Sequence, residues 1–208
     1  MSKLGAGIYA FFLVLFGLLC YLAHRFPYFP GDIAISLWLQ AIKLPFFKLS
    51  MQGVSFISSF IPSVIIVILV AGGLLAWRRK LEPIFIAALA VIQAPLNSLL
   101  KLLISRPRPS SEIGQVLSAN SGFSFPSGHT TYAVVFYGFL FYLTPRLVRQ
   151  PVAARTLQSL LILLIFLTAI SRIYLGAHWA SDTLGSLLFG GLLLVPAIAL
   201  YNKYSKSR

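Results

Sequence analysis

The chain has 208 residues, of which 58% are hydrophobic and only 10% are charged, and its mean hydropathy is +0.88. This composition excludes a soluble globular domain and indicates an integral membrane protein. The formal net charge of +13 does not indicate nucleic-acid binding, because the basic residues lie at the ends of apolar stretches and form no patch with interleaved aromatic residues.

A membrane-spanning helix needs about 20 mostly apolar residues, and six stretches of the chain approach this length. They are 4–23, 54–77, 83–103, 130–145, 156–174 and 183–201. The first is too long for the apolar part of a secretory signal, and no clear cleavage site follows it, so we expect a retained anchor. We therefore predict an all-α, polytopic membrane protein with six transmembrane helices in one bundle and a single domain over residues 1–208.

Three connecting segments are expected on one side of this bundle. The first, about 24–53, holds several prolines around an amphipathic stretch, which predicts either a helix lying in the membrane interface or an ordinary loop packed on the bundle. The second, 104–126, is rich in Pro, Ser and Gly and is predicted to be irregular. The third is a tight turn around Gly176.

The basic residues predict the orientation in the membrane. With the N-terminus in the cytoplasm, ten of the seventeen Lys and Arg residues fall on the cytoplasmic side, as the positive-inside rule favours. These ten are Lys3, Arg78, Arg79, Lys80, Arg146, Arg149, Arg155, Lys203, Lys206 and Arg208. Both termini are therefore predicted to be cytoplasmic, and the three segments above are predicted to lie at the outer face.

Ionisable residues inside apolar stretches are costly in a bilayer and are functional candidates by default. The third stretch ends with Gln93, Asn97 and Lys101, spaced four apart and so on one helical face. Arg106 and Arg108 follow, each before a proline. A snorkelling lysine with flanking arginines would explain part of this pattern, but the polar stripe favours a lined cavity.

His178 and Asp182 lie four residues apart, directly before the sixth stretch. They can share one helical face, with the carboxylate placed to hold an imidazole nitrogen. The whole chain has only four acidic residues and three histidines, so the use of one of each inside a membrane helix is hard to explain structurally. The pair is therefore interpreted as functional.

His129 lies at the predicted start of the fourth helix, directly after Ser127 and Gly128. The free N–H groups and the positive dipole end of a helix N-terminus favour a bound anion, and a glycine permits close approach of the backbone. An anion bound there would have His129 beside it.

The ends of the third and fifth helices and the starts of the fourth and sixth all meet at the outer end of the predicted bundle. Three cations, Lys101, Arg108 and Arg172, would converge there with a helix N-terminus and two histidines. Guanidinium groups present a fork that matches phosphate oxygens, so this set of residues suits a phosphate monoester.

The same segments resemble the three signature motifs of the type 2 phosphatidic acid phosphatase superfamily, K-x6-R-P, P-S-G-H and S-R-x5-H-x3-D. Here they read KLLISRPRP, PSGH and SRIYLGAHWASD, in the same order and within about residues 93–186. The fixed positions are filled by Lys101, Arg108, Pro109, Pro126, Ser127, Gly128, His129, Ser171, Arg172, His178 and Asp182. The resemblance also selects Arg108 over Arg106 as a phosphate ligand, which spacing alone leaves open.

The resemblance implies a catalytic role for three of these residues. His178 would attack phosphorus to form a phosphohistidine, with Asp182 orienting its ring and balancing its charge. His129 would protonate the leaving oxygen and then activate the water that hydrolyses the intermediate. Because one histidine must be neutral while the other is protonated, a bell-shaped pH profile is expected.

The resemblance also implies how the phosphoryl group is bound. Lys101, Arg108, Arg172, Ser127 and the Gly128 amide would bind its oxygens and stabilise charge in the transition state. Neither a metal nor another cofactor is expected, and no nucleic-acid partner.

The function implied is metal-independent hydrolysis of a lipid phosphate or diphosphate at the outer face of a bacterial inner (plasma) membrane. Candidate substrates are undecaprenyl diphosphate, which the compact chain slightly favours, phosphatidylglycerol phosphate, phosphatidic acid and lipid A phosphates. A phosphotransferase with a lipid or sugar hydroxyl as acceptor would use the same motifs. A transporter or silent scaffold fits less well, because the chain shows no repeated halves and has lost no motif residue. The sequence leaves the oligomeric state open.

Overall fold

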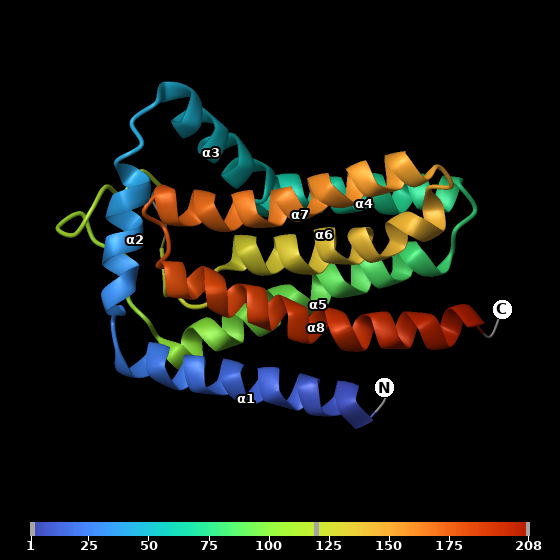
Figure 1. Cartoon of the computed structure of the whole chain (residues 1–208), viewed down its shortest axis with the longest axis horizontal. Coiled ribbons are helices and arrows are strands. Elements are labelled where there is room, and N and C mark those ends of the chain that lie inside the picture. Colours follow the sequence, from blue (N-terminus) through green and yellow to red (C-terminus); the bar gives the residue numbers. More distant parts are fainter. Residues whose placement is uncertain (1–2, 119–120, 207–208) are drawn as a thin grey trace.

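The computed structural model of the chain describes residues 3–118 and 121–206, which form eight α-helices and no strand. The helices are α1 (Lys3–Arg25), α2 (Pro30–Gln40), α3 (Pro45–Ile57), α4 (Phe60–Ala76), α5 (Leu81–Ile104), α6 (Gly128–Leu147), α7 (Pro151–Tyr174) and α8 (Ala180–Lys206). The long helices run side by side, whereas α2 lies across one end of the bundle (Figure 1). The all-α prediction is confirmed for these residues.

Helix α6 forms the centre of the bundle and packs against α5, α7 and α8. Ser127 caps its N-terminus, because the Ser127 side chain accepts a hydrogen bond from the Thr130 N–H at 3.5 Å. Residues on several sides of α6 are fully covered, among them Ala133, Phe139 and Leu143. The N-terminus of α6 is therefore held in place by its neighbours.

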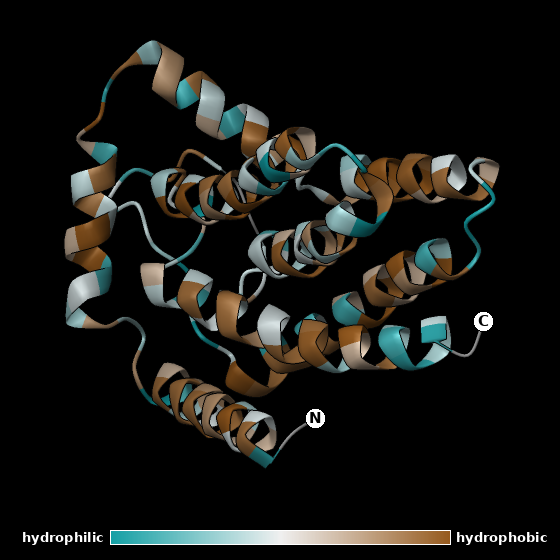
Figure 2. Ribbon diagram, turned by 45° about the vertical axis from the view of Figure 1, so that its right-hand side comes forward, coloured by the Kyte–Doolittle hydropathy of each residue, from teal (hydrophilic) through white to brown (hydrophobic). Residues whose placement is uncertain are grey.

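Helices α1, α5, α7 and α8 are each long and apolar enough to cross a membrane. Their outward faces carry exposed apolar side chains, as on α1, where Phe11 is 63% and Val14 is 72% exposed. Hydrophobic residues line these helices along most of their length (Figure 2). Soluble proteins rarely expose so much apolar area to water, so this surface indicates an integral membrane protein.

A fifth span would consist of α3 and α4, which together pass the same test but are bent by 63° relative to each other. The expectation of one continuous stretch over 54–77 is wrong in this respect. Pro62 has no N–H to bond the Ser58 carbonyl, and the chain bends at Ser58 and Ser59. Hydropathy alone cannot reveal this bend, because the apolar residues continue through it.

The predicted fourth span, 130–145, is helical as part of α6 but is not among the helices that pass the test for a membrane span. Its surroundings explain its composition: polar side chains such as Thr130, Thr131 and Thr144 are buried against neighbouring helices rather than exposed to lipid. Six spans therefore stay a prediction.

The first connecting segment forms two helices, α2 and α3, each beginning at a proline whose fixed φ suits the first helical position. Helix α2 packs against α7 and α8, so it covers the end of the bundle where these two helices meet. The second segment is irregular between Ile104 and Gly128 apart from a short turn, as predicted, for the part that the structure describes.

The ends of α5 and α7 and the starts of α6 and α8 lie at the end of the bundle that α2 covers, and both chain termini lie toward the opposite end (Figure 1). The predicted convergence of the motif segments is thus present. Which end faces the cytoplasm stays a prediction, and Arg208, one of the residues used for it, lies outside the described residues.

Candidate active site

His178 is presented by a tight turn between α7 and α8. The N–H groups of Ala177 and His178 both bond the Arg172 carbonyl, at 3.0 and 3.2 Å, which closes the turn. Gly176 adopts φ +66°, and a Cβ there would lie 2.1 Å from the Gln115 carbonyl oxygen. Only glycine fits this position, so the turn predicted around Gly176 has a steric reason.

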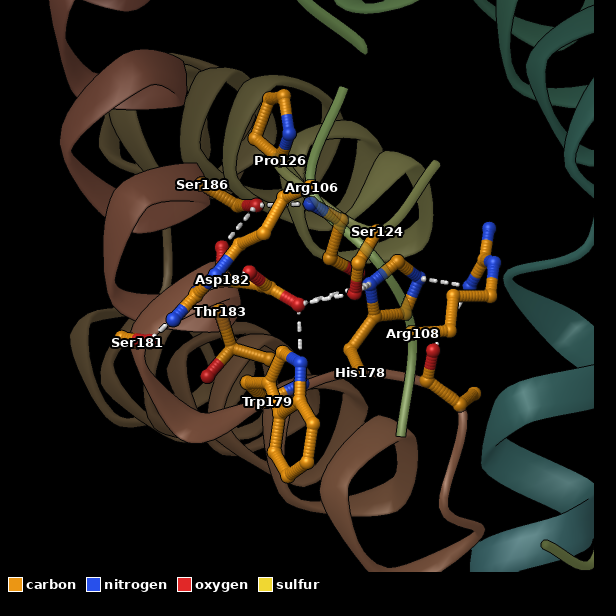
Figure 3. Close-up of polar contacts among 12 residues, drawn as sticks. Arg106, Arg108, Ser124, Pro126, His178, Trp179, Ser181, Asp182, Thr183 and Ser186 are labelled. Atoms are coloured by element: carbon orange, nitrogen blue, oxygen red, sulfur yellow. Dashed lines mark hydrogen bonds and ion pairs between the residues drawn. The ribbon is translucent and has the colours of Figure 1, made fainter. Parts of the chain in front are cut away.

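One side of the His178 ring faces the carboxylate of Asp182, which lies one helical turn further on. His178 Nδ1 is 3.5 Å from Asp182 Oδ2, and the hydroxyl of Ser124 lies beside both, 3.4 Å from Nδ1 and donating a short hydrogen bond to Oδ2 (Figure 3). The Trp179 N–H also donates to Oδ2, at 2.9 Å. Asp182 is thereby fixed beside the ring.

The other side of the ring faces Arg108. Arg108 Nη1 lies 3.2 Å from His178 Nε2 and donates to the Ala177 carbonyl at 2.7 Å. The same guanidinium donates to the carbonyls of Gly122 and Ser121, at 2.9 and 3.3 Å. Because a guanidinium only donates, Nε2 is the acceptor here and Nδ1 carries the proton that points toward Asp182.

The electrostatic setting keeps His178 neutral. The residue is only 2% exposed. Burial first, and then the positive charges of Lys101, Arg108 and Arg172, lower the pKa of His178 well below its ordinary value. The ring is therefore a neutral base, and its lone pair at Nε2 faces Arg108 Nη1.

Lys101, on the last turn of α5, holds the segment that precedes α6. Its Nζ donates to the carbonyls of Phe123 and Ser124, at 2.8 and 3.0 Å. The hydrogen bonds that Lys101 forms do not involve His178 within the described part of the chain, although its charge acts on the ring.

Ser127 and Gly128 lie at the N-terminus of α6, as predicted. Ser127 Oγ accepts from Thr130 Oγ1 at 3.1 Å, and the Ser127 N–H donates to Ser186 Oγ on α8 at 2.7 Å. A Cβ on Gly128 would lie 3.4 Å from Asn97 Nδ2, so the Asn97 side chain of α5 packs directly against the Gly128 backbone. This packing ties the helix N-terminus to both neighbouring helices.

His129 and Arg172 line a cavity of about 340 Å³ beside the bend between α3 and α4. Ser55 and Ser59 from that bend also line it, and Arg172 donates a short hydrogen bond to Ser55 Oγ. His178 is not among the lining residues. The structure thus brings His178, Asp182 and Arg108 into contact and places His129 and Arg172 together on an adjoining cavity.

Two further charged residues support this site: Asp32, which sequence reasoning missed, and Arg106, for which it found no role once Arg108 was selected as the phosphate ligand. Arg106 Nη1 donates to Asp182 Oδ1 at 2.6 Å, and Arg106 Nη2 donates to Asp32 Oδ2 at 3.0 Å. Both side chains are buried. The scarcity of acidic residues, which singled out Asp182, applies equally to Asp32 and could have marked it.

The described residues, 3–118 and 121–206, contain no group of three or more His, Cys, Asp or Glu side chains that could hold a metal ion. The charged groups that surround His178 are mostly cations, which suit an anionic ligand.

Comparison with known proteins finds a matching family and a curated relative. Residues 79–206 match the family model of the PAP2 superfamily. Phosphatidylglycerophosphatase B of Bacillus subtilis (strain 168) is 29% identical over 191 residues, which cover 89% of each chain.

Two solved structures share the fold. The crystal structure of a transmembrane PAP2 type phosphatidylglycerolphosphate phosphatase from Bacillus subtilis superposes with a TM-score of 0.82 and 24% identity, over 94% of this chain and 96% of that one. Aquifex aeolicus LpxE superposes with a TM-score of 0.67 and 19% identity, over 82% of this chain and 96% of that one. Since the family model spans more than half of its residues, the chain belongs to the PAP2 superfamily.

Proposed function

We propose that this protein hydrolyses a lipid phosphate or diphosphate without a metal ion, through a phosphohistidine at His178. The observation that carries the proposal is the orientation of the His178 ring: Nδ1 faces Asp182 Oδ2 at 3.5 Å, and Nε2 faces Arg108 Nη1 at 3.2 Å. A neutral imidazole held on one side by a carboxylate and facing a phosphate-binding cation on the other is arranged for attack on phosphorus.

In the first step, His178 Nε2 forms a bond to phosphorus while the bond from phosphorus to the leaving oxygen breaks. His129 donates a proton to that oxygen. The imidazole becomes positively charged as it is phosphorylated, and Asp182 stabilises that charge through Nδ1–H. In the second step, His129 takes a proton from water, the water oxygen attacks phosphorus, and the bond between phosphorus and Nε2 breaks.

The phosphoryl oxygens would be held by Arg108, Arg172 and Lys101, together with the N-terminus of α6 at Ser127 and Gly128. Arg108 already lies against Nε2, so a phosphoryl group arriving there would replace the ring as the partner of Nη1. Preorganised cations and backbone N–H groups lower the barrier because they need no rearrangement as negative charge shifts in the transition state.

The substrate class is a phosphorylated membrane lipid whose headgroup reaches the end of the bundle while its chains stay in the bilayer. The name of the 29% identical relative favours phosphatidylglycerol phosphate over the undecaprenyl diphosphate that chain length slightly favours. We propose that the site lies at the outer face of the bacterial inner membrane, as the distribution of basic residues predicts.

The test is phosphate release by the purified protein in mild detergent with EDTA, from phosphatidylglycerol phosphate, undecaprenyl diphosphate and phosphatidic acid. Wild type should release phosphate from at least one of them, and His178→Ala should lose nearly all activity. His24→Ala is the matched control, because His24 bonds the Ile104 carbonyl at 3.1 Å, outside the site. The proposal would be overturned if folded wild type released no phosphate from any of the three lipids, or if His178→Ala were as active as wild type.

A further inference from the structure

Asp32 is a buried carboxylate at the start of α2, 2% exposed, and it belongs to the segment that covers the end of the bundle. Its Oδ1 accepts from the Ser181 N–H at 2.8 Å. Its Oδ2 accepts from Ser181 Oγ at 2.7 Å, from the Phe29 N–H at 2.8 Å and from Arg106 Nη2 at 3.0 Å. The bond to Phe29 caps α2, whereas the other donors belong to α8 and to the segment after α5.

Arg106 connects this carboxylate to the candidate active site. Its Nη1 donates to Asp182 Oδ1 at 2.6 Å and to Ser181 Oγ at 2.8 Å, and its Cζ lies 4.6 Å from the centre of the Phe29 ring. The Arg106 and Asp182 side chains are completely covered, and that of Asp32 nearly so. A continuous buried chain therefore runs from Asp32 through Arg106 and Asp182 to His178, part of which is visible in Figure 3.

The charges along this chain determine what Asp182 can do for His178. With two carboxylates on one guanidinium, the three groups keep a net charge of −1 beside the imidazole. If the charge of Asp32 were removed, Arg106 and Asp182 would form a neutral pair, and the ring would lose most of the negative field that stabilises its charged, phosphorylated form. Such couplings are strong in a buried site because water does not screen them.

We propose that Asp32 is a positioning residue of the active site: it holds Arg106 and shares its charge, so that Asp182 stays available to His178. This inference rests on the proposed function for its kinetic consequence. A pure capping role for Asp32 would need only the bond to the Phe29 N–H, and it predicts no effect on the chemistry at His178.

The kinetic test uses Asp32→Asn, which keeps the shape and removes the charge. We expect kcat to fall by about tenfold to a hundredfold, as when an outer carboxylate that orients a histidine is lost in other sites, with KM changed far less. Glu112→Gln is the matched control, because Glu112 is an exposed carboxylate in the neighbouring 104–126 segment. Wild-type kcat in Asp32→Asn would overturn the proposal.

A double-mutant cycle tests whether Asp32 acts through Arg106. The variant with both Asp32→Asn and Arg106→Gln should be no slower than Arg106→Gln alone, since residues acting through one partner are not additive. If the double variant instead lost kcat by the product of the two single-variant factors, the proposal would be contradicted. If Asp32→Asn does not fold, Arg106→Lys serves instead: it keeps the charge but cannot span both carboxylates, so a normal kcat in it would contradict the proposal.

A spectroscopic measurement separates this inference from the proposed function. The chain has three histidines, so ring-nitrogen NMR of histidine-labelled protein, assigned with His178→Ala, reports the His178 ring without any turnover. Asp32→Asn should move the Nδ1 signal of His178 and Glu112→Gln should not. An unmoved signal would overturn the role of Asp32 even in an active enzyme, whereas inactivity of wild type would overturn only the proposed reaction.

A different observation concerns the opposite end of the bundle. A cavity of about 880 Å³ lies between the turn after α4 and the turn after α6, and Arg78, Arg79, Arg146 and Arg149 all line it. Arg146 is fixed against Tyr142, with its Cζ 4.1 Å from the ring centre and a 3.1 Å bond from Nη1 to the Tyr142 carbonyl. Four arginines thus line one cavity.

Negative charge at this cavity is scarce. Glu82 lies 3.8 Å from Arg79 and also accepts from the Tyr201 hydroxyl at 3.1 Å. In the described ranges of the chain, no other carboxylate forms an ion pair with these arginines. Converging cations repel one another unless an anion joins them, and a guanidinium fork matches phosphate oxygens.

We infer that this cavity binds the phosphodiester headgroup of an anionic membrane lipid such as phosphatidylglycerol. Trp77 also lines it and is 62% exposed, as expected of a side chain at the boundary between lipid and water, where such headgroups lie. Basic pockets between helices at a membrane surface are typical sites for anionic headgroups.

The test compares melting temperatures in detergent with added phosphatidylglycerol, with phosphatidylcholine, and with inorganic phosphate. Phosphatidylglycerol alone should raise the melting temperature of wild type and of the control Lys43→Gln/Lys48→Gln, whose exposed lysines lie at the other end. The rise should vanish in Arg78→Gln/Arg149→Gln. An equal rise in that variant, no rise in wild type, or an equal rise with inorganic phosphate would overturn the inference.

Discussion

At the scale of single residues, the His178 ring is fixed between Asp182 and Arg108, and its pKa is lowered. The motif spacing predicted that His178, Asp182 and Arg108 would be functional, and the structure brings all three into contact. The spacing could not show that Ser124 lies beside both His178 and Asp182, because that contact depends on how the segment before α6 folds back over α8. Asp32 was missed for the same reason, since 149 positions separate it from Ser181.

The ionisation state of His178 is the first prediction. Since burial and nearby cations lower the pKa of His178, the neutral form should persist as the pH falls below the ordinary histidine range. Ring-nitrogen NMR should find His178 neutral from about pH 8 down to about pH 5, a range in which a free histidine becomes protonated. A midpoint near about 6.5 in the folded protein, seen in wild type and missing in His178→Ala, would contradict this description of the site.

At the scale of elements, the sequence predicted which ends meet but not how the first connecting segment folds. The prolines and amphipathic pattern of 24–53 were compatible with a helix or a loop, and the structure has two helices, α2 and α3. Burial of Asp32 at the start of α2 fixes the position of that helix, and this depends on partners in α8 and near Arg106 that are distant in sequence.

The turn before α8 gives a prediction of its own. Gly176→Ala would place a Cβ 2.1 Å from the Gln115 carbonyl oxygen in a backbone conformation that side chains disfavour. Unfolding free energy should fall by about 1–3 kcal/mol, and phosphate release should fall because His178 shifts with the turn.

Gly191→Ala on α8 is the control for this substitution, because a Cβ there meets no atom within 4 Å. Its unfolding free energy and activity should stay near those of wild type. If Gly176→Ala were as stable and as active as Gly191→Ala, the steric account of the turn would be wrong.

At the scale of the whole molecule, composition was enough to predict an all-α membrane protein, whereas the number of spans stays a prediction. The stretch 130–145 belongs to α6, which packs against several neighbouring helices. Its polar residues therefore lie against these helices rather than against lipid. A hydropathy scan cannot distinguish these two environments. Four helices, or five with the bent pair, meet the test of length and composition.

The orientation in the membrane is tested with single cysteines. Ser110→Cys lies in the 104–126 segment near the candidate site, and Ser205→Cys lies near the C-terminus; both positions are exposed. In intact bacterial cells expressing each variant in a Cys20→Ser background, a membrane-impermeant maleimide should label residue 110 once the outer membrane is permeabilised, and should leave residue 205 unlabelled. The reverse pattern would contradict an outer-face site.

The central claim is a covalent intermediate on His178, and rapid quenching with radiolabelled substrate tests it most directly. Wild type and His24→Ala, mixed with a lipid phosphate that wild type hydrolyses and quenched in alkali, should carry acid-labile label on the peptide that contains His178. His178→Ala should carry none. Label retained in His178→Ala, or active wild type that never becomes labelled although its chemical step is shown to be fast, would contradict the phosphohistidine mechanism.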